Sequence, residues 1–222
     1  MFPIRDYNPR KSTPIVVISL IAFNTFIYFQ YFDFQEQKLL QLFSILGIVP
    51  AHFRFITLIT HQFLHGGLLH LISNMWALWI FGDNIEDRIG HGRFLIFYLL
   101  CGISAGLIHT ITQPSSTVPC VGASGAISGV IGSYLFLYPT ARIWCVVPII
   151  IYLYSITVPA IVFGIIWFLI QLMNGLIVMA SNEDVAGVAW WAHIGGFIAG
   201  ILLLPLFLKK EEPDESDTDM NL

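Results

Sequence analysis

Apolar runs close to 20 residues long recur along this chain and limit what it can fold into. A helix needs about 20 such residues to cross a hydrocarbon core roughly 30 Å thick. The composition agrees, because 56% of the 222 residues are hydrophobic and only 11% are charged, whereas soluble domains carry about 25% charged residues. The sequence therefore predicts an all-α polytopic membrane protein.

Six transmembrane spans account for the apolar runs. They lie at about residues 14–32, 67–81, 94–111, 122–138, 158–180 and 188–208. The chain then divides into a cytoplasmic N-terminal segment (1–13), a six-span domain (14–208) and a tail (209–222). The tail is polar and acidic, so we expect it to be disordered.

The positions of the basic residues decide the number of spans. One further apolar stretch, residues 143–156, is short and contains Pro148, so it could be a seventh span or an interfacial, re-entrant connection. Cytoplasmic connections carry an excess of Lys and Arg. With six spans the basic residues that flank them fall on one side, whereas a seventh span would place Arg142 and Lys209 on opposite sides. We therefore expect six spans, both termini in the cytoplasm, and an interfacial connection at 143–156.

A few polar side chains lie inside the predicted spans, where they are costly and are candidates for function. His70 and Asn74 are four residues apart, so one face of a helix carries both. Their plainest role is an interhelical hydrogen-bonded pair that holds the bundle together. His109 lies near the outer end of the third span and is expected to be an ordinary interfacial residue.

Small residues form a stripe along two of the spans. The stripe of the fourth span is Gly125, Ser128, Gly129 and Gly132, and that of the sixth is Ala189, His193, Gly196 and Gly200. Such stripes let two helix backbones approach closely. If the two stripes pack together, Ser124 at the start of the fourth span faces His193 on the sixth.

Ser124 and His193 in contact would form a minimal nucleophile and base, because the imidazole can take the hydroxyl proton as attack begins. The resulting oxyanion needs hydrogen-bond donors. The Ser124 backbone amide at a helix N-terminus could supply one, and the His70 and Asn74 side chains could supply others. Since no carboxylate is available at that depth, we expect a Ser–His dyad whose histidine is oriented by packing alone.

Other interpretations of these residues remain open. Ser124 could be a packing residue in a bundle without activity, in which case Ser124→Ala would be silent. A metal-dependent membrane protein is a second alternative, because His61 and His65 are four residues apart, His70 follows them, and imidazoles bind zinc. Against a metal site, the sequence contains no HExxH motif and no carboxylate near these histidines.

Three stretches bring these candidates together in one order. They are HQFLHGGLLHLISNMW with His70 and Asn74, GASG with Ser124, and WWAHIGGFIAG with His193. With these stretches the chain resembles the rhomboid family of intramembrane serine proteases, and the resemblance extends from about residue 15 to residue 208. It implies a six-helix, rhomboid-like bundle whose fourth helix begins within the membrane, at a water-filled cavity.

The resemblance also implies a role for each site residue. Ser124 would be the nucleophile and His193 the general base and then the acid. His70, Asn74 and the backbone amide of Ser124 would form the oxyanion hole, with Gly122 permitting the turn before the serine. No cofactor, metal or nucleic acid is expected to take part.

The partners that the resemblance implies are the lipid bilayer and transmembrane protein substrates with small, helix-destabilising residues. It also implies that a substrate enters laterally near the second and fifth spans, where Trp167 and Phe168 are candidate gate residues. A rhomboid-like protein that binds membrane segments without cutting them is the alternative within the family. Because the sequence shows no long soluble domain and no transit peptide, we expect a prokaryotic plasma (inner) membrane.

Overall fold

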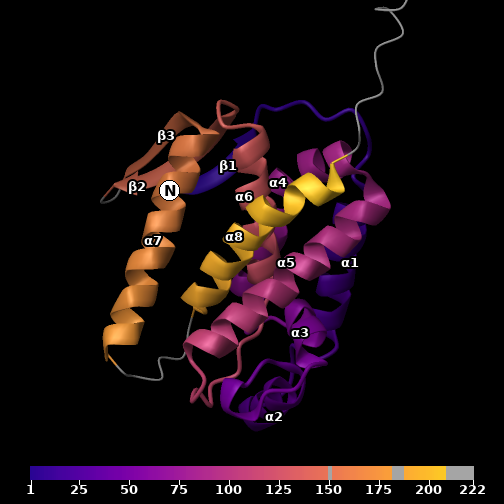
Figure 1. The fold of residues 1–222 in the computed structure, drawn as a ribbon, viewed down its shortest axis with the longest axis vertical. Helices are drawn as coiled ribbons and strands as arrows, with labels where there is room; N and C mark the ends of the chain where they lie inside the picture. Colours follow the sequence, from indigo (N-terminus) through magenta and orange to yellow (C-terminus); the bar gives the residue numbers. More distant parts are fainter. Residues whose placement is uncertain (150–151, 182–187, 209–222) are drawn as a thin grey trace, which may run out of the picture.

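Helices make up most of the chain in the computed structural model, which describes residues 1–149, 152–181 and 188–208. The α-helices are α1 (Ile15–Phe29), α2 (Glu36–Leu46), α3 (Thr57–Thr60), α4 (Leu68–Ile89), α5 (His91–Thr112), α6 (Ser124–Leu137), α7 (Ala160–Ser181) and α8 (Trp190–Phe207). Short 3-10 helices occur at η1 (Pro50–His52) and η2 (His61–Phe63), and the strands are β1 (Phe2–Asp6), β2 (Arg142–Ile149) and β3 (Tyr152–Pro159). Figure 1 shows the strands at the end of the helical bundle opposite α2 and α3. The acidic tail at 209–222 lies outside the described residues.

Three of the described helices are long and apolar enough to cross a membrane: α5, residues Ala160–Ala180 of α7, and α8. The helices α1 and α6 are apolar but shorter, with 15 and 14 residues. Helix α4 has 22 residues but carries Asp83, Glu86 and Asp87 towards its C-terminal end. The chain is thus a mostly helical membrane protein, and the count of six spans stays a prediction.

A three-stranded antiparallel sheet corrects the all-α prediction. Strands β2 and β3 form a hairpin in which Arg142 pairs with Pro159 and Ile149 with Tyr152, and β1 pairs with the other edge of β2. Residues 143–149 and 152–156, which the sequence predicts to lie in an interfacial connection, form most of these two strands. This stretch is rich in β-branched and aromatic residues, which favour strands. Pairing also satisfies the backbone groups of a segment too short to span a membrane as a helix.

The N-terminal segment packs onto the helices. Besides the pairing of β1 with β2, Asp6 accepts a hydrogen bond of 2.9 Å from the hydroxyl of Tyr134 on α6. The buried carboxylate of Glu86 on α4 accepts the backbone N–H groups of Val16 and Val17 at 2.8 and 2.7 Å. These first-turn amides have no partner within α1, so Glu86 both caps α1 and holds it against α4.

Helix α6 lies among α4, α5 and α8, and the small residues explain how closely it packs (Figure 1). A methyl group added at Gly196 would overlap the carbonyl oxygen of Gly125, and one added at Gly200 would overlap that of Gly129. The hydroxyl of Ser133 on α6 donates to the carbonyl of Gly200 at 3.0 Å. The predicted packing of the two small-residue stripes is therefore confirmed, and it sets the distance between the first turns of α6 and α8.

Candidate active site

The close packing of α6 and α8 brings Ser124 and His193 into contact. Ser124 is the first residue of α6, and His193 lies in the first turn of α8. The Nε2 atom of His193 lies 2.7 Å from the Oγ atom of Ser124. A hydroxyl at this distance from an imidazole nitrogen can pass its proton directly to that nitrogen.

A cavity of about 650 Å³ opens beside this pair. Its lining includes Ser124, His193, His70, Asn74 and Trp167, so side chains from α4, α6, α7 and α8 meet there. All four of the predicted site residues with functional side chains therefore face one cavity. A space of this size accommodates several residues of an extended peptide or a number of water molecules.

A backbone hydrogen bond fixes which ring nitrogen of His70 can act as a donor. Its Nδ1 atom accepts a hydrogen bond of 3.2 Å from the backbone N–H of Gly66. In a neutral imidazole the other nitrogen then carries the proton, which makes Nε2 a donor. A Cβ atom at Gly122 would lie only 2.9 Å from Nε2, so this donor rests against the backbone two residues before Ser124.

Gly122 shapes the entry into α6. Its φ angle of +134° is one that residues with a side chain rarely adopt. Its N–H donates to the carbonyl of His61 at 2.9 Å, and the preceding Cys120 pairs with Ile48 through two backbone hydrogen bonds of 2.8 and 3.0 Å. The turn before Ser124 is thus anchored to the long connection between α1 and α4.

Asn74 is more constrained than the sequence suggests. Its Nδ2 atom donates 2.7 Å to the carbonyl of His70, one turn earlier on α4. Its Oδ1 atom is buried and has no hydrogen-bond partner among the described residues. An amide nitrogen carries two protons, so Asn74 keeps one N–H that can still donate. The Nε2–H of His70 donates none of the hydrogen bonds found among the described residues.

Gln171 on α7 is a site residue that is not among those predicted from the sequence. Its Oε1 atom lies 2.7 Å from the Nδ1 atom of His193, so the prediction that packing alone orients this histidine is wrong. The available signal is a polar side chain in the middle of an apolar span, the same signal that selects His70 and Asn74. Packing contributes as well, because the Trp167 ring lies 6.0 Å from the His193 ring at an interplanar angle of 32°.

The family model of the Rhomboid domain matches residues 52–210, which is most of the chain and includes Ser124, His193, His70 and Asn74. The chain belongs to the rhomboid family. This family includes serine proteases that act on membrane proteins in a bilayer.

Several relatives support the assignment. RHOMBOID-like protein 5 of Arabidopsis thaliana is 31% identical over 146 residues, which are 66% of this chain and 42% of the relative. Rhomboid protease GluP of Bacillus subtilis is 36% identical over 143 residues, or 64% and 24% of the two chains. RHOMBOID-like protein 12, mitochondrial, of Arabidopsis thaliana is 30% identical over 198 residues, or 82% and 55%.

The same relatives are longer than this chain, and they come from different organisms. This rhomboid chain spans only between 24% and 55% of the relatives' lengths. They come from a bacterium and from a plant, and one carries a mitochondrial name. They support an integral membrane protein but give no support to the prokaryotic origin expected from the sequence.

His61 and His65, the other two histidines of the HQFLHGGLLHLISNMW stretch, are both buried. The Nδ1 atom of buried His61 lies 2.7 Å from the carbonyl of Thr57. His65 is buried, and its ring packs edge-to-face on that of His70, with the centroids 5.2 Å apart. Within the described ranges, no three His, Cys, Asp or Glu side chains are grouped so that they could hold a metal ion. The metal alternative therefore gains no support from the arrangement of these rings.

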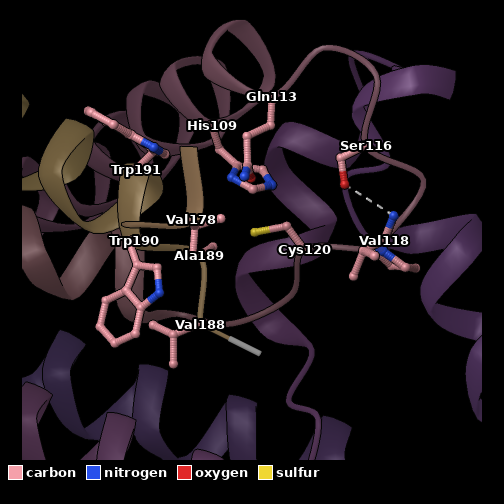
Figure 2. A pocket seen from close by; sticks show the side chains of 11 residues that line it. His109, Gln113, Ser116, Val118, Cys120, Val178, Val188, Ala189, Trp190 and Trp191 are labelled. Atoms are coloured by element: carbon pink, nitrogen blue, oxygen red, sulfur yellow. Dashed lines mark hydrogen bonds between the residues drawn. The ribbon is translucent and has the colours of Figure 1, made fainter. Parts of the chain in front are cut away.

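A second, small cavity of about 40 Å³ adjoins the first and shares Cys120 and Ala189 with it. Figure 2 shows His109, Gln113, Ser116 and Trp191 around it. His109 is only 5% exposed, so it is a buried residue that lines this cavity near the C-terminal end of α5, and its expected interfacial position stays a prediction. The volume exceeds the roughly 15 Å³ that one water molecule needs, and its lining is polar enough to hold water.

Proposed function

We propose that this chain is an intramembrane serine endopeptidase that cleaves transmembrane segments of other membrane proteins. The observation that carries the proposal is the 2.7 Å contact between Ser124 Oγ and His193 Nε2 at the edge of a large cavity. The contact joins a nucleophile to a base in a place that a peptide backbone can reach. Membership of a family that includes serine proteases supports the same activity.

The geometry supports a two-step reaction. The Oγ atom of Ser124 attacks the carbonyl carbon of the scissile bond while His193 Nε2 takes the hydroxyl proton. The tetrahedral intermediate collapses, the C–N bond breaks, and the imidazolium gives its proton to the leaving amine. An acyl ester on Ser124 remains. His193 then takes a proton from water as that water attacks the ester, and the return of this proton to Oγ restores the serine and releases the carboxylic acid.

Three candidate donors for the oxyanion of the intermediate belong to residues that line the same cavity as Ser124. The first is the Nε2 proton of His70, and the second is the backbone amide of Ser124 itself, whose position in the first turn leaves it without an intrahelical partner. The third is the free amide proton of Asn74. Gly122 supports this arrangement because any side chain there would fill the space in front of the His70 ring.

The length of α6 supports a site below the membrane surface. With 14 residues and a rise of 1.5 Å per residue, α6 spans about 21 Å, which is less than the roughly 30 Å of a hydrocarbon core. Ser124 at its N-terminus then lies inside the bilayer, with the cavity as its water-accessible space. The proposal includes six spans within residues 14–208, cytoplasmic termini in a plasma membrane, and substrate entry between α4 and α7.

The test of this function uses the purified protein in detergent or liposomes with a single-span model substrate. We expect cleavage that resists a metal chelator, together with covalent labelling by a serine-directed fluorophosphonate that mass spectrometry locates on Ser124. Neither result is expected of a protein that only binds membrane segments. Cleavage that stops on chelation, or labelling of another serine, would contradict the proposal.

His70→Ala is expected to lower kcat by a factor on the order of 10² to 10³, the cost of removing one oxyanion donor. Asn74→Ala is expected to cost less, because the Asn74 amide is already bonded to the backbone of α4. Both losses should be smaller than that caused by removing the Ser124 hydroxyl. The measurement is steady-state cleavage of the model substrate by each variant.

The matched control for both variants is Ser73→Ala. The Ser73 hydroxyl donates to the same His70 carbonyl at 3.0 Å, so this change removes a hydrogen bond from the same turn of α4 without removing a donor to the oxyanion. Its kcat should stay close to that of the wild type. A loss in Ser73→Ala as large as that in His70→Ala would instead indicate that the turn of α4 is simply being destabilised.

A further inference from the structure

The polar contact made by α7 with the candidate active site comes from Gln171, which is 5% exposed. We infer that Gln171 is a positioning residue for His193, holding the imidazole in the tautomer and orientation that a general base requires. This inference rests on the proposed function of the Ser124–His193 pair. It extends the dyad to a hydrogen-bonded series of three side chains, contributed by α6, α8 and α7.

The orientation of the Gln171 amide is determined by its own second contact. Its Nε2 atom donates to the carbonyl of Trp167, one turn earlier on α7, at 3.3 Å. A carbonyl oxygen can only accept, so this end of the amide must be the NH₂ group. The end that faces His193 is therefore the oxygen, which is also only an acceptor.

The amide oxygen in turn selects the tautomer of His193. Because Oε1 of Gln171 can only accept, the proton of a neutral His193 ring must lie on Nδ1 to make the 2.7 Å hydrogen bond. The Nε2 atom is then unprotonated and faces Ser124 Oγ at 2.7 Å. This is the form of the imidazole that can take a proton from the serine.

Packing around the ring cannot make the same selection. Trp167 and Trp190 lie against His193, with ring centroids 6.0 and 6.3 Å away and interplanar angles of 32° and 85°. These contacts restrict the plane of the ring, but an apolar surface does not distinguish Nδ1–H from Nε2–H. Only a hydrogen-bond partner at Nδ1 does so, and Gln171 is the one found among the described residues.

Because the partner of His193 is a neutral amide, the expected loss of kcat on replacing Gln171 is moderate. When His193 takes the serine proton, the Nδ1–H group stays bonded to a neutral oxygen, which stabilises the imidazolium less than a carboxylate would. Loss of Gln171 should therefore cost less than loss of the acid in a Ser–His–Asp triad. A decrease in kcat on the order of 10- to 100-fold is expected, the range found when the hydrogen-bonded partner behind a metal-binding histidine is lost.

The experiment compares three variants of the full chain with the wild type. Gln171→Met keeps the length of the side chain and removes the acceptor, so kcat should fall while KM stays near the wild-type value. Gln171→Glu keeps an oxygen acceptor and should recover most of the lost kcat. Asn174→Leu is the matched control, because Asn174 is a polar residue on α7 whose Nδ2 donates to the backbone of Ile170 at 2.7 Å and which is only partly buried.

A purely structural role for Gln171 predicts a different pattern. Gln171→Met and Asn174→Leu would then lower the melting temperature and kcat together, and Gln171→Glu would not restore kcat. That pattern, or a Gln171→Met variant with wild-type kcat, would overturn the inference. Wild-type kcat in Asn174→Leu alongside a rescued Gln171→Glu would support it.

A readout independent of cleavage separates this inference from the proposed function. The ¹⁵N shifts of the His193 ring nitrogens, assigned by their loss in His193→Ala, report which nitrogen carries the proton. We expect a protonated Nδ1 in the wild type and in Gln171→Glu, and a mixture of tautomers in Gln171→Met. Unchanged shifts in Gln171→Met would refute the inference even if cleavage is observed. A wild type that neither cleaves nor reacts with the fluorophosphonate would refute the proposed function whatever these shifts show.

Discussion

Replacing Ser124 by alanine is expected to reduce cleavage of a model transmembrane substrate by at least about 10³-fold, to the level of the background. The change removes the hydroxyl that lies 2.7 Å from the imidazole of His193, while leaving the helix start intact. His193→Ala should cause a loss of similar size, because the serine hydroxyl then loses the imidazole nitrogen that lies 2.7 Å away and takes its proton. Residues that act as one unit have non-additive effects, so the double variant should be no worse than either single one.

The control for Ser124→Ala is Ser128→Ala on the same helix. The Ser128 hydroxyl donates to the carbonyl of Ser124 at 2.6 Å, which makes it a cavity serine committed to its own helix. This variant should keep most of the wild-type rate and still react with the fluorophosphonate. If Ser124→Ala or His193→Ala cuts at a rate near that of the wild type, the mechanism proposed for this pair is wrong.

Gly196→Ala is expected to lower the cleavage rate on the order of 10²-fold and to lower the melting temperature. The added methyl group would overlap the carbonyl of Gly125, a backbone atom that cannot rotate away, so α6 and α8 must move apart. Gly125 directly follows Ser124, and a displacement of about 1 Å between reacting groups can cost 10²-fold in rate. Cleavage kinetics, fluorophosphonate labelling and thermal unfolding of the variant test the prediction.

Gly92→Ala provides the comparison. A Cβ atom at Gly92 on α5 would meet no atom within 4 Å, so the same substitution there should leave the rate unchanged. It should also stabilise the helix slightly, since alanine has a higher helix propensity than glycine. Equal behaviour of the two variants would show that close contact between α6 and α8 is unimportant for placing Ser124 beside His193.

The sequence predicts the central pair because helical periodicity determines which residues share a face. Gly125, Gly129, Gly196 and Gly200 can be placed on two stripes by counting alone, and the stripes do pack in the structure. Ser124 follows from this packing, because it directly precedes the first glycine of its stripe. The contact of Ser124 with His193 is therefore a local consequence of two patterns, each contained within one span.

The stretch 143–156 has a structure that the spacing of its residues does not predict. Its residues are apolar enough for a membrane-associated segment, and charge placement correctly argues against a spanning helix. Whether such a segment forms a hairpin depends on a partner for its free edge. That partner is β1, more than 130 residues away in the chain, where Phe2 pairs with Val146. Pairing between distant segments leaves no periodic signature in either one.

The sequence by itself determined the membrane class and the family, and it predicted the helix faces on which Ser124, His193, His70 and Asn74 lie. The placement on these faces depends on residue type and on spacing within single helices. Only the tertiary structure decided which nitrogens are free to react. The backbone N–H of Gly66 donates a hydrogen bond to Nδ1 of His70, the Nδ1–H of His193 donates one to Oε1 of Gln171, and these contacts select the two tautomers. The second of these joins α7 to α8, and a hydrogen bond between side chains on two helices forms only when packing brings their atoms within about 3 Å.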